Sequence, residues 1–332
     1  MSKNLRLVRA LFHAAKVQDA VSPYDTLHLK VFYPAQMSDS DRERNLGIVP
    51  ADTQHSPFKV VILLGGINCD PPMYQWLAVK LVERGLVVVT FSWVAQNLPG
   101  IVALSPGVDI KMLTPNAYGS GPTASALPAI LQALEELNTQ GVLAGLLDLQ
   151  HITIGGHSAG GRVALESASP SFFPQIAAAF AYGAHTAAGE QLGYPSGSIL
   201  PLPDALPLML IGGTRDGVIA NSSFRYGLEW EDPTTPVQRT FDEAIAGGRE
   251  DSYLLLIEGA NHFSIAYPFD PTVGRPFLDY SATQSEEAIR DCIAEVIGLF
   301  VETHVCDRPK AKTALDAILG TNNPPIASFQ RK

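Results

Sequence analysis

The chain has 332 residues, of which 46% are hydrophobic and 17% are charged. Such a high apolar share with so few charges excludes an intrinsically disordered chain and predicts a large buried core. The 33 acidic and 23 basic residues give a net charge of −10, which argues against nucleic-acid binding because phosphate backbones would be repelled.

The number and spacing of the cysteines indicate the redox state of the compartment. Cys69, Cys292 and Cys306 are odd in number and stand outside any CxxC spacing. They predict neither a disulfide framework nor a zinc site, and they fit a reducing, cytoplasmic environment. The first 16 residues do not resemble a secretory signal, which would need an apolar core and a small-residue cleavage site. Proline and glycine interrupt the uncharged stretch 85–108, so we do not expect it to span a membrane.

Short apolar runs alternate with segments of helical periodicity along most of the chain. Residues 27–33 (LHLKVFY) alternate apolar and polar side chains as a half-buried strand does, and Pro34 is expected to end it. Further strands are predicted at 60–64, 86–93, 151–155, 177–182, 206–211 and 253–257. Helices are predicted at 73–84, 123–138, 160–167, 237–246 and 285–303.

This alternation predicts an α/β fold with a mostly parallel central sheet, helices on both faces, and loop or lid insertions. Two strands joined by one helix, as at 60–93, form a right-handed parallel unit. No linker divides the chain. We therefore expect one domain over 25–303, an N-terminal extension over 1–24 and a C-terminal tail over 304–332.

The motif Gly156-His157-Ser158-Ala159-Gly160 follows one predicted strand and opens a helix. In that context GxSxG forms a sharp, strained turn that exposes the serine hydroxyl at the top of the sheet. Ser158 is the candidate nucleophile. The alternative is a glycine-rich turn whose serine only caps the helix.

A nucleophilic serine needs a base and an acid that orients the base. Asp216 follows the strand at 206–211, and His262 follows the strand at 253–257, so both come after Ser158 in the order expected of such a triad. Asp204 and Glu258 are rival acids. Asp204 precedes its strand, and Glu258 is too near the histidine in sequence to hold it.

Hydrolysis also needs N–H donors for the oxyanion. The residue after the nucleophile, Ala159, supplies one. The other is expected from Ile67, in the glycine-containing loop that follows the strand at 60–64. Gly66 and Asn68 of the same loop are expected to contact substrate.

Two segments with few charged residues indicate whether the pocket wall is apolar. Residues 85–134 contain only two formal charges, and 167–203 contain one. Parts of both follow strand ends, where the crevice of an open α/β sheet lies. His185 is a candidate for another pocket residue. The candidates for an apolar lid or acyl wall are Leu98, Ile101, Val102, Leu104, Met112, Leu113, Ile199 and Leu200. The alternative is that these loops only cover the core.

Taken together, VVILLGGINCDPPMYQWLAVKLVERGLVVVTFSW, GGHSAGG, GGTRDG and EGANHF resemble the α/β-hydrolase family over roughly residues 25–303. The resemblance is to a branch with dienelactone-hydrolase-like proteins, platelet-activating-factor acetylhydrolases, polyesterases and chlorophyllases. It implies Ser158 as nucleophile, Asp216 as acid and His262 as base. Two departures are Gly65-Gly66 where many relatives have His-Gly, and Ala159 where chlorophyllases have arginine.

The expected function is that of a serine carboxylic-ester hydrolase working through an acyl-enzyme, on a hydrophobic ester of lipid or chlorophyll type. Alternatives are a thioesterase or acyltransferase with the same triad, a hydrolase of small esters, and a non-catalytic hydrolase-fold binding protein. Peripheral membrane contact is compatible with such a substrate. No cofactor and no metal are expected, since the sequence has no HExxH and no phosphate-binding glycine motif.

Overall fold

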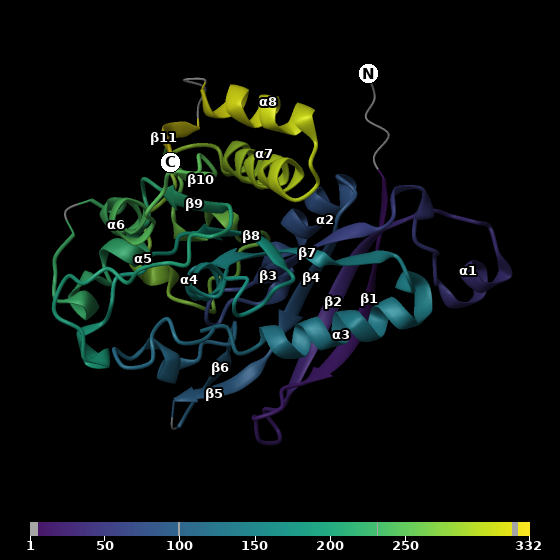
Figure 1. Cartoon of the computed structure of the whole chain (residues 1–332), viewed down its shortest axis with the longest axis horizontal. Coiled ribbons are helices and arrows are strands. Elements are labelled where there is room, and N and C mark those ends of the chain that lie inside the picture. The colour runs from purple at the N-terminus through teal and green to yellow at the C-terminus, as the bar shows by residue number, and fades with distance from the viewer. Residues whose placement is uncertain (1–5, 99, 231, 321–324) are drawn as a thin grey trace.

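The apolar runs assemble into one central sheet (Figure 1), in a computed structural model that describes residues 6–98, 100–230, 232–320 and 325–332. Within these residues the strand order is β1-β2-β4-β3-β7-β8-β9-β10-β11. The strands are β1 (Leu7–Lys16), β2 (Thr26–Ala35), β3 (Phe58–Leu64), β4 (Val87–Ser92), β7 (Leu147–His157), β8 (Ile176–Tyr182), β9 (Leu208–Gly213), β10 (Ser252–Ile257) and β11 (Ile326–Arg331). From β4 to β10 neighbouring strands are parallel, while β1, β2 and β11 pair antiparallel.

The parallel strands are buried on both faces, which explains their unbroken apolar sequences. In β3, Val60 and Ile62 pack into one hydrophobic cluster, whereas Val61 and Leu63 pack into the other. Because side chains alternate along a strand, a single run of valine, isoleucine and leucine supplies both cores. The predicted mostly parallel sheet with helices on both faces is confirmed.

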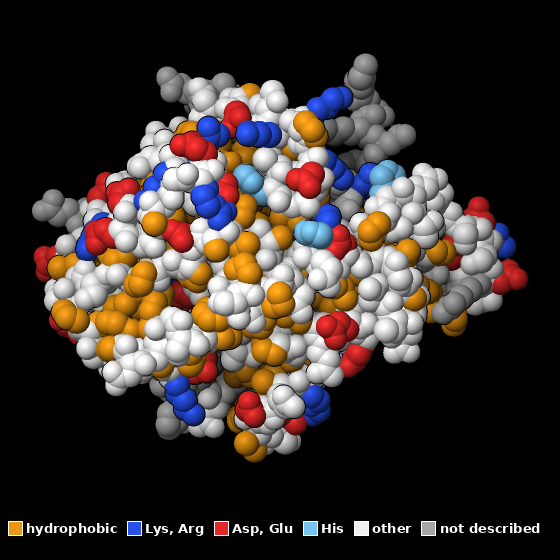
Figure 2. Space-filling model, viewed as in Figure 1, with side chains coloured by type: hydrophobic (Ala, Val, Ile, Leu, Met, Phe, Trp, Pro, Cys, Tyr) orange, Lys and Arg blue, Asp and Glu red, His pale blue; other side chains and the backbone are white. Residues whose placement is uncertain are grey.

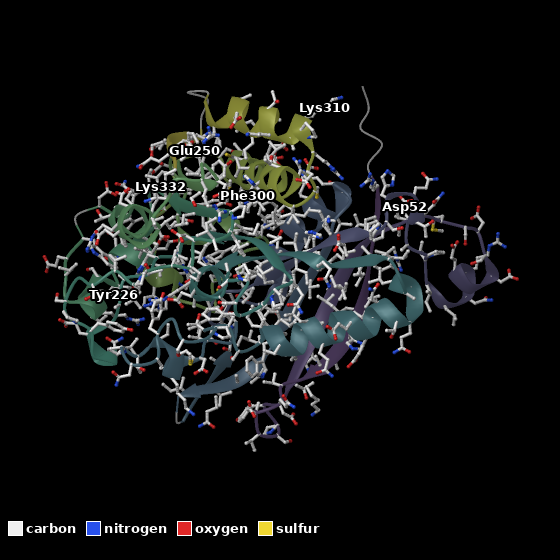
Figure 3. All side chains as sticks on the ribbon, in the orientation of Figure 1. Asp52, Tyr226, Glu250, Phe300, Lys310 and Lys332 are labelled. Carbon is white, nitrogen blue, oxygen red and sulfur yellow. The ribbon has the colours of Figure 1, made fainter. Side chains whose placement is uncertain are left out.

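Helices cover the two faces separately (Figure 1). One cluster contains α2 (Gln75–Glu83), α7 (Glu286–His304) and α8 (Pro309–Leu319), and the other contains α3 (Leu127–Thr139), α4 (Ala159–Glu166) and α6 (Thr235–Ala244). Figure 3 places Phe300 between α7 and the sheet, where its ring centroid lies 5.8 Å from that of Tyr253 on β10. The remaining helical elements are α1 (Asp41–Leu46), α5 (Gly217–Ala220), η1 (Thr53–His55), η2 (Pro71–Tyr74), η3 (Ile110–Leu113), η4 (Gly141–Leu143), η5 (Glu190–Leu192), η6 (Ser223–Tyr226), η7 (His262–Ile265) and η8 (Pro276–Leu278).

The sheet extends beyond the limits expected for the domain, 25 and 303. β1 comes from the segment expected to be an N-terminal extension, and it pairs with β2 along its whole length. α8 and β11 come from the expected C-terminal tail, where α8 packs on α7 and β11 pairs with β10. Both edge strands are half-exposed and carry polar residues, so their sequences lack the apolar runs of the central strands.

The segment expected to form a lid begins with a hairpin, β5 (Val94–Leu98) and β6 (Ile101–Leu104), which is separate from the central sheet. Its alanines are buried, while Val94, Ile101 and Val102 are 48%, 54% and 48% exposed. On the face shown in Figure 2, charged side chains stand apart and uncharged ones fill the surface between them. Among the described residues, no helix has the length and apolar content needed to cross a membrane.

Candidate active site

Ser158 occupies a strained turn between β7 and α4. Its φ is 54° and its ψ is −125°, a conformation that is costly for a residue with a side chain. The Ser158 N–H donates to the carbonyl oxygen of Tyr182, at 2.9 Å, which fixes the turn against β8. A Cβ at Gly160 would lie 2.3 Å from the carbonyl oxygens of Leu64 and Gly65, so glycine is required for this close approach of α4 to β3.

Asp216 and His262 form a buried pair at the carboxyl ends of β9 and β10. Asp216 Oδ2 lies 2.8 Å from His262 Nδ1, and the two residues are 1% and 3% exposed. The other oxygen of Asp216 accepts the N–H of Ile219 at 2.9 Å, which holds the carboxylate at the start of α5. Because the carboxylate oxygen accepts, Nδ1 donates and Nε2 of the neutral imidazole is left to take a proton. The rival acids Asp204 and Glu258 make no contact with His262.

The loop that carries His262 is anchored on several sides. The Tyr182 hydroxyl donates to the carbonyl oxygen of Asn261 at 2.6 Å, and the side chains of Asn261 and Ser264 form a capping box around η7. Asp279, which sequence reasoning missed, accepts the N–H of Phe263 at 3.2 Å. Burial raises the pKa of Asp279, and the nearby charge of Asp216 raises it further. No motif surrounds this aspartate, so only the fold shows its position.

Ser158 and His262 line one cavity of about 420 Å³. Its walls come from the loops after β3, β7, β8, β9 and β10, which are the carboxyl ends of five parallel strands. This is the edge of an open α/β sheet where ligands bind. Ile67, Asn68 and Ala159 line the same cavity, so the structure brings five of the residues expected from sequence together.

Two backbone N–H groups are available beside Ser158. Ala159 is the first residue of α4, so no earlier turn of that helix supplies an acceptor for its N–H. The Ile67 N–H has no acceptor among the described residues, whereas its neighbour Gly66 donates to the hydroxyl of Tyr74 at 3.0 Å. Gly66 therefore lies behind the cavity, fixed by that hydrogen bond, and Ile67 is the residue that can turn its N–H toward a ligand.

A buried histidine is linked through Tyr74 to the loop that carries Gly66 and Ile67. The Tyr74 hydroxyl lies 2.9 Å from Nδ1 of His157, the residue before the candidate nucleophile. Burial lowers the pKa of His157 well below its usual range, and the charge of His262 lowers it further. The ring of His157 is therefore neutral. It packs 4.6 Å from the ring of His262, centroid to centroid, and positions both loops without titrating near neutral pH.

Most of the residues expected to form the apolar wall do not line the cavity. Leu104, on β6, accepts the Asn68 N–H and donates its own N–H to the Asn68 side chain, and its side chain does not line the cavity. Of the two candidates on η3, Leu113 lines the cavity as expected and Met112 does not. Leu98 ends β5, and its side chain lies outside the described part of the structure.

Three arginines line the cavity instead, and sequence reasoning missed all of them. Arg162 is on α4, Arg225 is on η6, and Arg275 lies in the loop before η8. They fall outside the charge-poor segments 85–134 and 167–203 on which the apolar expectation rested. The fold joins charged residues from three other segments, so the cavity wall carries positive charge.

His185 also lines the cavity, as expected from its place after β8. Its ring packs edge-on against the stacked rings of Tyr226 and Trp230, with centroids 5.0 and 5.2 Å away, and Figure 3 marks Tyr226 at this side of the molecule. Nδ1 accepts the N–H of Ala187 at 3.2 Å. Burial lowers the pKa of His185 to about 3, and the charges of Arg162 and His262 contribute.

We expect His185→Gln to make the protein less sensitive to acid. Between pH 6.5 and about 3, the unfolded chain protonates this histidine but the folded protein does not, so its contribution to stability falls with pH. The loss is about 1.4 kcal/mol per pH unit. Denaturant unfolding between pH 6 and 4 should show that slope reduced by about this amount in the variant. His28→Gln, at an exposed position of β2, is the control, and an equal slope in His185→Gln and wild type would contradict the expectation.

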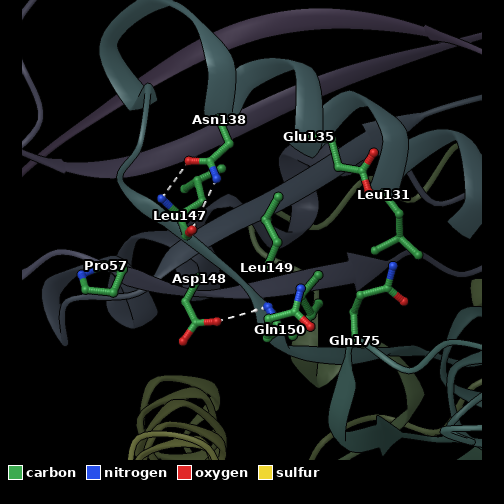
Figure 4. A pocket seen from close by; sticks show the side chains of 10 residues that line it. Pro57, Leu131, Glu135, Asn138, Leu147, Asp148, Leu149, Gln150 and Gln175 are labelled. Carbon is green, nitrogen blue, oxygen red and sulfur yellow. Dashed lines mark hydrogen bonds between the residues drawn. The ribbon is translucent and has the colours of Figure 1, made fainter.

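A second pocket, of about 470 Å³, lies at the opposite edge of the sheet (Figure 4). Its lining includes Leu147 and Asp148, at the amino end of β7, and Asn138, whose side chain pairs with the backbone of Leu147. Ser158 follows the other end of the same strand. Within the described residues, no group of three or more His, Cys, Asp or Glu side chains is placed to hold a metal ion. The cavity around Ser158 is therefore the candidate active site.

Comparisons with known proteins identify the fold. No protein-family model matches the chain, and a search of curated proteins finds no relative. Among solved structures, a ferulic acid esterase from Streptomyces cinnamoneus is similar, with a TM-score of 0.64 over 99% of this chain and 97% of that one. The two sequences are 15% identical, so the likeness concerns architecture. The predicted α/β-hydrolase-like fold is confirmed.

Proposed function

We propose that the protein is a carboxylic-ester hydrolase in which Ser158 is the nucleophile, His262 the general base and Asp216 its orienting acid. The observation that carries this proposal is the buried pair of Asp216 and His262, which shares a cavity with a serine held in a strained turn. Serine hydrolases on unrelated folds use the same set of groups.

The reaction follows from the roles of these atoms. The Ser158 hydroxyl attacks the ester carbonyl carbon while Nε2 of His262 takes its proton, and the N–H groups of Ile67 and Ala159 bind the oxyanion. The protonated imidazole then gives its proton to the departing alcohol. A water molecule attacks the acyl-enzyme by the same route, releasing the acid and restoring Ser158.

The comparison with the ferulic acid esterase supports the ester-hydrolase class through shared architecture. A thioesterase or an acyltransferase would use the same acyl-enzyme and differ in the leaving group or in the acceptor. A non-catalytic binding protein would not need a strained serine beside an aspartate–histidine pair. The proposed triad therefore favours an enzyme.

The substrate proposed from sequence is a hydrophobic ester, lipid-like or chlorophyll-like. Apolar cavity residues support an apolar portion of the ligand, namely Val108, Leu113, Val163, Val218, Ile219 and Phe263. Each buried methylene of a ligand contributes up to about 0.8 kcal/mol. The exposed valines and isoleucine of the β5–β6 hairpin are the surface we propose for contact with a membrane or lipid aggregate.

Labelling with a fluorophosphonate probe tests the proposed function, because only an activated serine reacts quickly. We expect a single modified peptide containing Ser158, and no labelling of Ser158→Ala. The control is Ser120→Ala, at an exposed position away from the cavity lining, which should label as the wild type does. An unlabelled wild-type protein, or a label on another residue, would overturn the proposal. Parallel assays with an oxygen ester and its thioester separate the two hydrolase classes.

A further inference from the structure

Positive charge in the cavity is not balanced by the groups that line it. Among the described lining residues there are three arginines and no aspartate or glutamate. One arginine is neutralised nearby: Arg162 Nε donates to Glu166 at 2.8 Å, and both side chains are largely buried. Of the other acids near the cavity, Asp216 is engaged by His262, and Asp279 accepts backbone N–H groups. Arg225 and Arg275 are therefore left without a carboxylate partner among the described residues.

The two remaining arginines lie near each other at the same wall. Arg275 Nη1 donates to the hydroxyl of Ser222 at 3.1 Å, and Ser222 is itself fixed by donating to the carbonyl oxygen of Val218. Arg225 extends from η6, the helix that follows Ser222, and its side chain is exposed. Partial burial lowers the pKa of Arg275, and the charge of Arg225 lowers it further, while Tyr226 and the carboxylate of Asp216 act in the opposite direction.

Two like charges that converge on a cavity favour a ligand of opposite charge. Guanidinium groups donate several N–H bonds in a fixed plane, a geometry that suits carboxylate and phosphate oxygens. An anion placed between Arg225 and Arg275 would offset their repulsion and pair Arg275 where it is partly removed from water. A cavity of about 420 Å³ has room for such a group together with a short ester.

We propose that Arg225 and Arg275 bind an anionic group of the substrate, so that the ester hydrolysed at Ser158 also carries a carboxylate or a phosphate. The inference rests on the proposed esterase function and deepens it by naming a substrate class. The apolar residues of the cavity then contact the chain between the ester and the anionic group. Arg275 is the positioned member of the pair, and Arg225, at the exposed side, is the first to meet an incoming anion.

A matched pair of esters tests this. The mono-4-nitrophenyl ester of adipic acid ends in a carboxylate, and the corresponding adipamic acid ester ends in a neutral amide of nearly the same size. For the wild type we expect kcat/KM to be at least about tenfold higher for the carboxylate ester, with the ratio falling as sodium chloride is added. A ratio near one at low salt would overturn the inference.

Variants assign the effect to the two arginines. Arg225→Gln and Arg275→Gln should each lower the ratio of the two kcat/KM values, and the double variant should bring it near one. Arg275→Lys keeps the charge and should restore part of the ratio. Arg44→Gln, an equal charge change on the distant helix α1, should leave the ratio as in wild type (Figure 1). A ratio unchanged by Arg225→Gln, whose exposed position makes misfolding an inadequate explanation, would count against the assignment.

A third ester, bearing a terminal phosphate in place of the carboxylate, identifies the preferred anion. A higher kcat/KM for this ester assigns the site to phosphate, and a lower one assigns it to carboxylate. Failure of the inference and failure of the proposed function give different results. If all the esters are hydrolysed at equal rates and the fluorophosphonate labels Ser158, the esterase proposal is supported and the proposed anion site is wrong. If none is hydrolysed and Ser158 stays unlabelled, both proposals fall.

Discussion

Replacing Ser158 with alanine should lower kcat for any hydrolysed ester by about 10⁴-fold or more, because the acyl-enzyme can no longer form. The free energy of unfolding should stay nearly unchanged. The Ser158 side chain makes no capping hydrogen bond to α4, and alanine meets the same backbone strain at φ 54°. What remains in the variant is binding and oxyanion stabilisation alone.

The measurement is steady-state hydrolysis by purified wild-type and variant protein, with unfolding followed in denaturant. A mock purification is the control for a contaminating esterase. If contamination causes the residual activity, Ser158→Ala and the mock purification have the same rate. Hydrolysis at more than about a hundredth of the wild-type kcat, above that background, would show that Ser158 is not the nucleophile.

Asp216→Asn should lower kcat by about 10³- to 10⁴-fold with the fold retained. The amide oxygen can still accept the Ile219 N–H, so the start of α5 keeps its capping bond. The amide nitrogen, however, would then face Nδ1 of His262 and donate to it. That places the imidazole proton on Nε2, where a base is needed, and the histidine cannot accept the proton of Ser158.

Asp279→Asn is the matched comparison, since this second, half-buried carboxylate binds only backbone N–H groups near the same histidine. We expect it to lose less than about tenfold in kcat, mainly through a less well positioned loop. Should Asp279→Asn prove the more damaging of the two changes, the roles of the carboxylates must be exchanged. Both variants are measured across pH, so that a displaced profile can be told from a lower plateau.

The central sheet was predictable because each parallel strand carries its own signal. VVILL, HITIG and YLLLI are short apolar runs, and β3, β7 and β10 enclose them. The edge strands gave no comparable signal. In β1 three polar residues, Arg9, His13 and Lys16, interrupt apolar ones that are mostly exposed or half-buried, and nothing local to LVRALFHAAK shows that β2 will lie beside it. Strand pairing at an edge depends on the partner, which lies elsewhere in the sequence.

The residues of the candidate site also include some that the sequence predicts and some that it does not. Ser158, Asp216 and His262 each follow a strong strand signal, so their common edge of the sheet could be inferred one residue at a time. The residues of the cavity wall could not be inferred in this way, because their position depends on which side of a short helix faces inward. In η3 both Met112 and Leu113 are apolar candidates, but only Leu113 lines the cavity. The arginines belong to three segments that only the tertiary fold brings together.

The antiparallel strand β11 bears on how the protein is made. During synthesis β10 and the His262 loop leave the ribosome well before β11, which follows about seventy residues later in the chain. Until β11 pairs with it, β10 is the edge of a growing sheet, and its sequence SYLLLI has high strand propensity and no charge. The nascent chain therefore passes through a state in which all the groups proposed for catalysis have been synthesised while the backbone N–H and C=O groups of this edge are unpaired. In the order of synthesis, the pairing of β11 with β10 is the last step that completes this sheet.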